Sequence, residues 1–431
     1  MEGKKSNMKR RIKEQSLIFY SVLKWIALSV LIGIFVGSTI AIFLKFLDVS
    51  VIFTTRYKWY FFFLPVVLFT NALLAQYIFP KSDAYKTDKV IESLHREQDI
   101  PITAALKAFF LPVLTIAGGG SAGKEAPAAD VGAGLGMLLG KIFRLDAYDR
   151  KKLAICGISA GFASVFGTPI AGAIFGVEFL FVGSILYDVL LPSFIAGIIS
   201  YNISSALGTH YFHHKLTTSF DFSAVLFYQI ILAGIFLGLC SFLLIEMLDS
   251  GKKVSERIKI WSPLKGFLGG VVLIIAALLF STDYLGLGLT TIQSALKGQR
   301  LEWYAFILKS FTTSVTLNFG GSGGIVTPIF FVGSSAGNIF AQVLHLDIVL
   351  FSALGFVGLL AGAANTPIAA SIMAIELFGP EMAPYAALVC VISFLMTGHR
   401  SVYPSQILAF KKSKLIDIEL GKELEKSEPK I

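Results

Sequence analysis

Charged residues are scarce in this chain. Only 15% of its 431 residues are Asp, Glu, Lys or Arg, whereas 55% are hydrophobic. A soluble protein would carry about 25% charged residues. The shortage of charge therefore argues against an ordinary soluble protein and predicts an all-α polytopic membrane protein, because a helix satisfies its own backbone hydrogen bonds in lipid.

Cysteine and histidine are also rare. The three cysteines, Cys156, Cys240 and Cys390, lie in apolar stretches, and their spacing matches neither a disulfide framework nor a metal site. Three of the six histidines, at positions 210, 213 and 214, stand among aromatic residues at the edge of an apolar stretch, a pattern typical of an interfacial loop. We therefore expect no metal and no cofactor.

Long apolar runs are present instead, and about 20 such residues cross a bilayer. Four runs are predicted to span it: Ile18 to Leu47, Trp59 to Phe79, Leu226 to Met247, and Phe267 to Phe280. Four more are short or rich in glycine: Pro101 to Ala117, Ala126 to Phe143, Ile325 to Leu344, and Pro367 to Leu377. The short runs predict helices that end at membrane depth, which are tolerated only where they line a cavity.

Basic residues gather outside these runs. They cluster in residues 1–16 and 252–259, and the tail at 411–431 carries mixed charge. By the positive-inside tendency, we expect these segments and both termini to be cytoplasmic. These segments account for the net charge of +9, so no nucleic-acid partner is expected.

A repeat is the most informative pattern in the chain. Residues 118–127 (GGGSAGKEAP) align without a gap on residues 319–328 (FGGSGGIVTP), 201 positions later. Residues 168–171 (TPIA) return at 366–369, 198 positions later. Broken apolar segments at matching places in two halves indicate a binding site between repeats. We place repeat one at about 17–215 and repeat two at about 223–410.

Each glycine-rich loop leads into a predicted helix with proline in its first turn. Glycine lets the backbone approach a ligand closely, and proline is tolerated at a helix start. The free N–H groups and the positive dipole end of a helix start attract an anion. Two convergent helix starts predict an anion site without a buried cation, which would hold the ion too tightly.

One charged pair, Lys124-Glu125, occurs in only one of the two loops. The Glu125 carboxylate would compete with an anion at the positive end of its helix, and protonation or movement would vacate the site. An ionisable residue inside a membrane is a functional candidate, although Glu125 is alternatively a structural cap. Glu178 and Glu376 recur in both halves, which favours a shared structural role.

The first loop also satisfies most of a P-loop pattern, from Gly118 to Lys124. A P-loop requires Ser or Thr next, after a buried strand. Glu125 stands there instead and would repel phosphate, and both flanking segments read as membrane helices. We therefore predict that the protein is not an enzyme.

These motifs resemble the CLC family of chloride channels and proton/chloride antiporters. Residues 123–127 (GKEAP) are similar to the family's Gly-Arg/Lys-Glu-Gly-Pro element, and residues 324–328 (GIVTP) to its Gly-x-Phe-x-Pro element. The resemblance covers about 17–410. It implies an inverted-repeat fold whose broken helices meet at mid-membrane, and a homodimer in lipid with one anion path per subunit. The two copies would meet around Pro192 to Tyr201 and Pro384 to Phe394.

By this resemblance Glu125 is the gating glutamate, and bound chloride ions are the expected ligands. The residues implied around the anion are Gly123, Lys124, Gly324, Ile325 and Val326, with the backbone N–H groups of the last two holding the central ion.

The chain departs from the family pattern in several places. The element whose serine coordinates the anion falls at residues 84–88 (AYKTD), so Tyr85 or Thr87 would supply the hydroxyl. Tyr403 is the counterpart of the central tyrosine. The proton-relay glutamate aligns with Phe179, which cannot carry a proton. About twenty residues follow the last span, so we expect the form without cytoplasmic nucleotide-binding modules.

The sequence therefore predicts chloride-selective transport of small anions, gated by protonation of Glu125. The missing relay favours channel-like conduction. The alternative is a proton-coupled chloride or fluoride antiporter, and secondary transport of another small anion is a remote third possibility.

Overall fold

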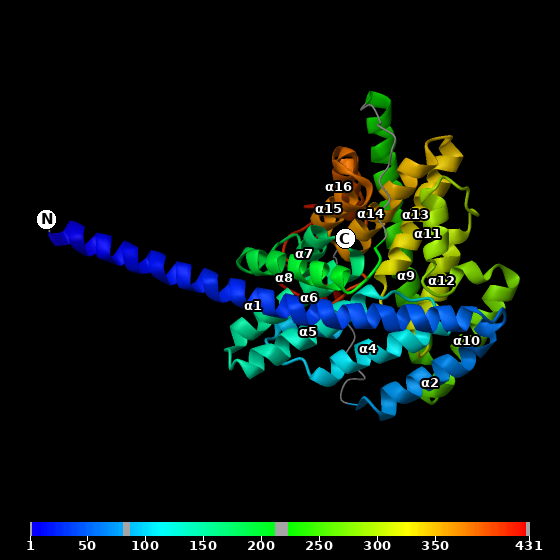
Figure 1. The fold of residues 1–431 in the computed structure, drawn as a ribbon. Coiled ribbons are helices and arrows are strands. Elements are labelled where there is room, and N and C mark those ends of the chain that lie inside the picture. The colour runs from blue at the N-terminus through cyan, green and yellow to red at the C-terminus, as the bar shows by residue number, and fades with distance from the viewer. Residues whose placement is uncertain (1, 81–86, 212–222, 428–431) are drawn as a thin grey trace.

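The computed structural model describes residues 2–80, 87–211 and 223–427, and helices dominate it (Figure 1). The first half contains α1 (Glu2–Thr55), α2 (Leu64–Tyr77), α3 (Thr87–His95), α4 (Ile102–Ala117), α5 (Glu125–Ile142), α6 (Ala147–Phe166), α7 (Pro169–Glu178) and α8 (Tyr187–Ala206). The second half contains α9 (Ala224–Arg257), α10 (Ser262–Leu279), α11 (Leu289–Leu296), α12 (Ala305–Asn318), α13 (Val326–Leu344), α14 (Ile348–Ala364), α15 (Pro367–Phe378) and α16 (Ala383–Met396).

Short elements connect these helices. Single 3-10 turns are η1 (Tyr60–Phe63), η3 (Thr282–Tyr284), η4 (Pro380–Met382) and η5 (Leu424–Lys426). The strands β1 (Phe181–Val182) and β2 (Ile407–Leu408) form one parallel pair.

Six helical segments in the described part of the chain are long and apolar enough to cross a membrane. They are residues 10–55, 60–77, 187–206, 224–257, 262–279 and 326–344. The four predicted spans correspond to α1, η1 with α2, α9 and α10. Helix α1 runs past the other helices and carries the N-terminus away from them (Figure 1).

The repeat is visible in the packing. Helix α5 packs on α6 as α13 packs on α14, and α1 packs on α8 as α9 packs on α16. A Cβ atom at Gly132 would lie 2.0 Å from the carbonyl oxygen of Gly157, and one at the matching Gly333 would lie 2.2 Å from that of Gly355. Both helix pairs therefore touch backbone to backbone, which is how membrane helices use small residues.

Two carboxylates join the halves reciprocally. Glu178, at the end of α7, accepts hydrogen bonds from the N–H groups of Ile368 (3.0 Å) and Ala369 (2.8 Å) at the start of α15. Glu376 of α15 accepts from Ile170 (3.1 Å) and Ala171 (2.8 Å) at the start of α7. Each satisfies two of the free N–H groups of the opposite helix. These reciprocal contacts support the predicted structural role of Glu178 and Glu376.

The described part of the C-terminal tail packs against the helices. Ile418 and Leu424 join Leu408, Val182 and Phe394 in a small apolar cluster. Strand β2 pairs with β1 through Phe181–Ile407 and Val182–Leu408. The tail therefore covers one end of the helical body.

Candidate functional site

The two glycine-rich loops meet. Gly123 donates its N–H to the carbonyl of Gly324 (2.6 Å), and Gly324 donates back to the carbonyl of Gly123 (2.7 Å). Helices α5 and α13 begin directly after this bridge, with Lys124 and Ile325 as their N-cap residues. The predicted convergence of two helix starts is therefore present.

The loops have matching left-handed turns. Gly119 and Gly320, which are 201 positions apart, have φ angles of 98° and 89°. Residues with a side chain rarely adopt this conformation, and glycine adopts it freely. The turns end α4 and α12 and allow each loop to bend back to the start of the next helix.

The Glu125 side chain bonds to a residue of the other half of the chain. The side chain is 4% exposed. The carboxylate accepts a hydrogen bond from the backbone N–H of Thr327 (3.0 Å) and another from the Thr327 hydroxyl (2.6 Å). Sequence analysis placed this carboxylate at the start of its own helix, whereas it lies at the start of α13. A negative group is stabilised there by the free N–H groups and the helix dipole.

The other residues expected around an anion lie at the same place. Ile325 and Val326 are buried, at 7% and 0% exposure. The N–H groups of Gly123 and Gly324 bond to the opposite loop, so they hold the two helix starts together. The roles of Gly123, Lys124, Gly324, Ile325 and Val326 as anion ligands stay predictions.

Two cavities reach these helix starts. One, of about 370 Å³, is lined by Lys124, Glu125 and Thr327 together with residues such as Asp48 and Gln293; we call it the gate-side cavity. The other, of about 230 Å³, also borders Pro404 and Lys252; we call it the tail-side cavity, because Lys252 forms an ion pair with Glu425 of the tail. The tail-side cavity is lined further by Thr87, Lys107, Asp130, Ile325 and Tyr403.

Tyr403 presents a free hydroxyl in the tail-side cavity. The side chain is 3% exposed, and its Oη atom has no hydrogen-bond partner in the described part of the chain. The Tyr403 ring meets Phe179 edge-on, at 5.7 Å between centroids. A buried hydroxyl without a partner is suited to donate to an anion.

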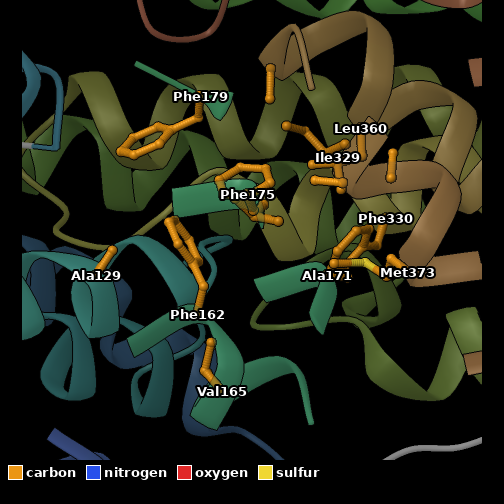
Figure 2. Close-up of a cluster of buried hydrophobic side chains, with 14 of the residues drawn as sticks. Ala129, Phe162, Val165, Ala171, Phe175, Phe179, Ile329, Phe330, Leu360 and Met373 are labelled. Atoms are coloured by element: carbon orange, nitrogen blue, oxygen red, sulfur yellow. The ribbon is translucent and has the colours of Figure 1, made fainter. Parts of the chain in front are cut away.

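Phe179 belongs to an aromatic cluster. Its ring contacts Phe175 at 5.5 Å and Phe162 at 5.7 Å, and Figure 2 shows the three rings close together. Phe179 is fully buried. The position expected for a proton relay is therefore filled by packed hydrocarbon.

Of the two residues predicted to replace the anion-coordinating serine, the structure describes only Thr87. Tyr85 lies outside the described residues. Thr87 opens α3, and its hydroxyl donates to Oδ2 of Asp130 (3.0 Å), so it does not point its proton at an anion here. Either residue as the replacement stays a prediction.

Sequence reasoning missed Thr327 and Asp130. A signal for both was present, because each is polar in only one repeat. Thr327 matches Ala126, and Asp130 matches Phe331, at the 201-residue offset. The same difference between matched positions of the two repeats that distinguishes Glu125 therefore distinguishes Thr327 and Asp130.

The P-loop alternative fails on geometry. The loop before Lys124 follows helix α4 instead of a strand, and Glu125 directly opens α5. The described residues around Lys124 therefore lack the strand–loop–helix order of a P-loop.

Comparison with known proteins agrees with this geometry. The family model described as voltage gated chloride channel matches residues 63–398. A "Chloride/fluoride channel protein" of Pseudomonas syringae pv. tomato is 34% identical over 420 residues, covering 96% of this chain and 92% of its own. A "Voltage-gated ClC-type chloride channel ClcB" of Escherichia coli is 26% identical, covering 73% of this chain and 78% of its own.

Solved structures show the same fold. A CLC-type fluoride/proton antiporter superposes with a TM-score of 0.86 and 29% identity, over 90% of this chain and 98% of that one. A slow cyanobacterial Cl⁻/H⁺ antiporter superposes with a TM-score of 0.77 and 17% identity, over 86% and 94% of the two chains. The fold is the CLC-type inverted repeat with broken helices, and the chain belongs to the voltage-gated chloride channel (CLC) family.

Proposed function

We propose that this protein carries small halide anions, chloride and fluoride, along a path that opens when Glu125 leaves the start of α13. The observation that carries the proposal is the pair of hydrogen bonds from Thr327 to the Glu125 carboxylate. A carboxylate and a halide seek the same N–H and hydroxyl donors, so they compete for one place. Protonation removes the charge that holds the carboxylate there.

The lining of the path favours small anions over cations. Two helix starts present positive dipole ends to the same point, and these repel a cation. Tyr403 adds on the tail side a hydroxyl that has no hydrogen-bond partner among the described residues. Permeation by fluoride is supported by the relative named a chloride/fluoride channel protein and by the likeness to the fluoride/proton antiporter.

For the mode of transport, we propose conduction without a fixed proton stoichiometry as the first candidate. Phe179 supports it, because a packed phenylalanine cannot pass protons from the tail side to Glu125. Proton-coupled antiport is the second candidate. The observation that favours it is a carboxylate in the tail-side cavity, Asp130.

The protein is an integral, multi-pass membrane protein, and we propose that both termini are cytoplasmic and that two copies associate. Helices α8 and α16 carry exposed apolar side chains, with Leu191 and Ile198 on α8 and Val391 and Leu395 on α16. These faces support the proposed contact between copies.

Flux from proteoliposomes tests the function. Vesicles loaded with potassium chloride or potassium fluoride are diluted into impermeant anion, valinomycin carries the potassium, and electrodes record halide and pH together. We expect halide efflux that rises as the pH falls. Efflux no greater than from empty vesicles, or potassium release without valinomycin, would contradict the assignment.

A further inference from the structure

Asp130 is a carboxylate in a place where an anion path should exclude one. It lies on α5, five residues after Glu125, which is about 7.5 Å along the helix axis. It lines the tail-side cavity together with Ile325 and Tyr403. An ionised Asp130 would repel any halide that enters this cavity. Asp88 and Asp249 also line this cavity, and Asp130 differs from them because it lies on α5, the helix that Glu125 opens.

The hydrogen bonding of Asp130 is half complete. Oδ2 accepts from the Thr87 hydroxyl (3.0 Å). Oδ1 is buried and has no hydrogen-bond partner among the residues that the structure describes. A protonated carboxyl group has one donor and retains acceptor capacity, so Oδ1 is the oxygen that would carry the proton. Thr87 can then keep donating to Oδ2 in both charge states.

The charged groups around Asp130 come from several elements. Lys107 of α4 is 8% exposed and interacts electrostatically with Asp130. Asp88 of α3 lines the same cavity, but Ser405 holds it with its N–H (2.8 Å) and hydroxyl (2.7 Å). Asp249 and Lys252 of α9 complete the charged lining. Asp88 is thus fixed as an acceptor, whereas Asp130 keeps one oxygen free.

Tyr403 lines the same cavity as Asp130. It lies within electrostatic range of both Asp130 and Glu125. Asp130 and Tyr403 both line the tail-side cavity of about 230 Å³, which has space for several water molecules, whereas Glu125 lines the gate-side cavity. A proton that passes from Asp130 to Glu125 has to leave the tail-side cavity beside Tyr403 and cross the helix starts to the gate-side cavity.

We propose that Asp130 is the residue that takes up protons from the tail-side solution and passes them through water to Glu125. Uptake converts the Asp130 carboxylate to the neutral acid. Transfer returns it to the carboxylate and leaves Glu125 neutral, so one proton moves and no net charge is created. Neutral Asp130 also admits the halide into the tail-side cavity. The inference rests on the proposed role of Glu125 as a protonatable gate, and it supports the second transport candidate, proton-coupled antiport, over the first.

The test compares Asp130→Asn with Asp249→Asn, which removes the same charge from the same cavity at an exposed position. Halide and proton flux are recorded with the pH set separately on the two sides. Protease cleavage of a C-terminal tag reports which side carries the tail. The wild type should change flux about tenfold per unit of tail-side pH within its titration range.

In Asp130→Asn we expect halide flux to persist, to respond less than about twofold to tail-side pH, and to keep its response to pH on the other side. Asp249→Asn removes a repelling charge and can change the size of the halide flux, but it should keep the wild-type response to tail-side pH. A wild-type response to tail-side pH in Asp130→Asn overturns the proposal, as does an equal effect of the two substitutions. Absence of halide flux from the wild type would instead refute the proposed function.

Asp130→Glu keeps the carboxyl group and covers the case in which Asp130→Asn does not fold. Its response to tail-side pH should persist with a displaced midpoint, because the longer side chain changes the contact with Thr87. An unmoved midpoint in a folded Asp130→Glu protein overturns the proposal.

Discussion

Thr327 holds Glu125 with two donors, its backbone N–H at 3.0 Å and its hydroxyl at 2.6 Å. The two residues belong to different repeats, and each is polar only in its own copy. The gate of this protein is therefore a contact between the halves.

Replacing Glu125 by glutamine should remove pH dependence from halide flux, because the carboxamide mimics the neutral acid and does not titrate. The flux of the variant should vary less than about twofold from pH 5 to 8, whereas wild-type flux should rise as the pH falls. Efflux from proteoliposomes measures this. Glu302→Gln, at an exposed loop position, is the matched control. Wild-type pH dependence in Glu125→Gln would show that another group gates the path.

Replacing Thr327 by valine should move the midpoint of the flux–pH curve to higher pH. The valine keeps the N–H but removes the hydroxyl donor, so the ionised carboxylate is less stable relative to the acid. Losing one hydrogen bond to a charged group costs about 1.5–3 kcal/mol. Thr327→Ser retains the hydroxyl and should keep the wild-type midpoint. Equal midpoints for the valine and serine variants would show that the Thr327 hydroxyl does not stabilise the Glu125 carboxylate.

Replacing Tyr403 by phenylalanine should weaken halide binding about three- to tenfold, because a hydroxyl donor is worth about 1 kcal/mol. The phenylalanine keeps the ring against Phe179, so packing is preserved. Isothermal titration of the detergent-solubilised protein gives the dissociation constant. Tyr228→Phe, on the exposed side of α9, should bind as the wild type. An unchanged dissociation constant in Tyr403→Phe would show that another residue supplies the central hydroxyl, with Tyr85 and Thr87 as the next candidates.

Replacing Glu376 by glutamine should destabilise the fold without moving the gate. Glutamine has one acceptor oxygen, so it can accept from only one of the N–H groups of Ile170 and Ala171 and turns its NH2 group toward the other, at a cost of about 1–3 kcal/mol. Thermal unfolding in detergent should shift down by roughly 2 °C or more. The midpoint of the flux–pH curve should stay where it is. A moved midpoint with unchanged thermal stability would give Glu376 a transport role instead.

Cysteine crosslinking tests the proposed contact between copies. The native cysteines Cys156, Cys240 and Cys390 are buried, so a cysteine introduced at exposed Ile198 or Val391 should react selectively. We expect a bifunctional thiol reagent to give a covalent dimer in mild detergent. A cysteine at exposed Tyr228 serves as the comparison. Dimer at Tyr228 and only monomer at Ile198 and Val391 would place the interface elsewhere.

The sequence predicted the helices and the meeting of the two loops because local patterns encode them. Apolar length marked the spans, and glycine with proline marked the starts of α5 and α13. Helix α1 extends well beyond the predicted span at 18–47, since a helix continues through polar residues when nothing breaks it. The apolar pattern shows only which part of that helix lies in lipid.

Contacts between distant residues could not be predicted in the same way. The residues near Glu125 indicated a helix start. No local pattern indicated that the carboxylate would accept hydrogen bonds at the start of α13 instead of at the start of α5. The bond between Thr87 and Asp130 joins two segments whose distance depends on the whole fold. Glu178 and Glu376 were predicted to be structural because they recur. Only the structure shows that each carboxylate accepts hydrogen bonds from a helix start in the opposite half.

The reciprocal caps have a consequence for biosynthesis. The ribosome adds Glu178 to the chain 198 residues before Glu376. Ile368 and Ala369, the partners of Glu178, are added only shortly before Glu376. At about 5–20 residues per second, the first half waits roughly 10–40 s with the start of α7 uncapped. During that time the nascent half exposes unsatisfied N–H groups and a carboxylate within the bilayer. Release of the second half from the translocation machinery, rather than completion of the first, is then the step that commits the chain to its native structure.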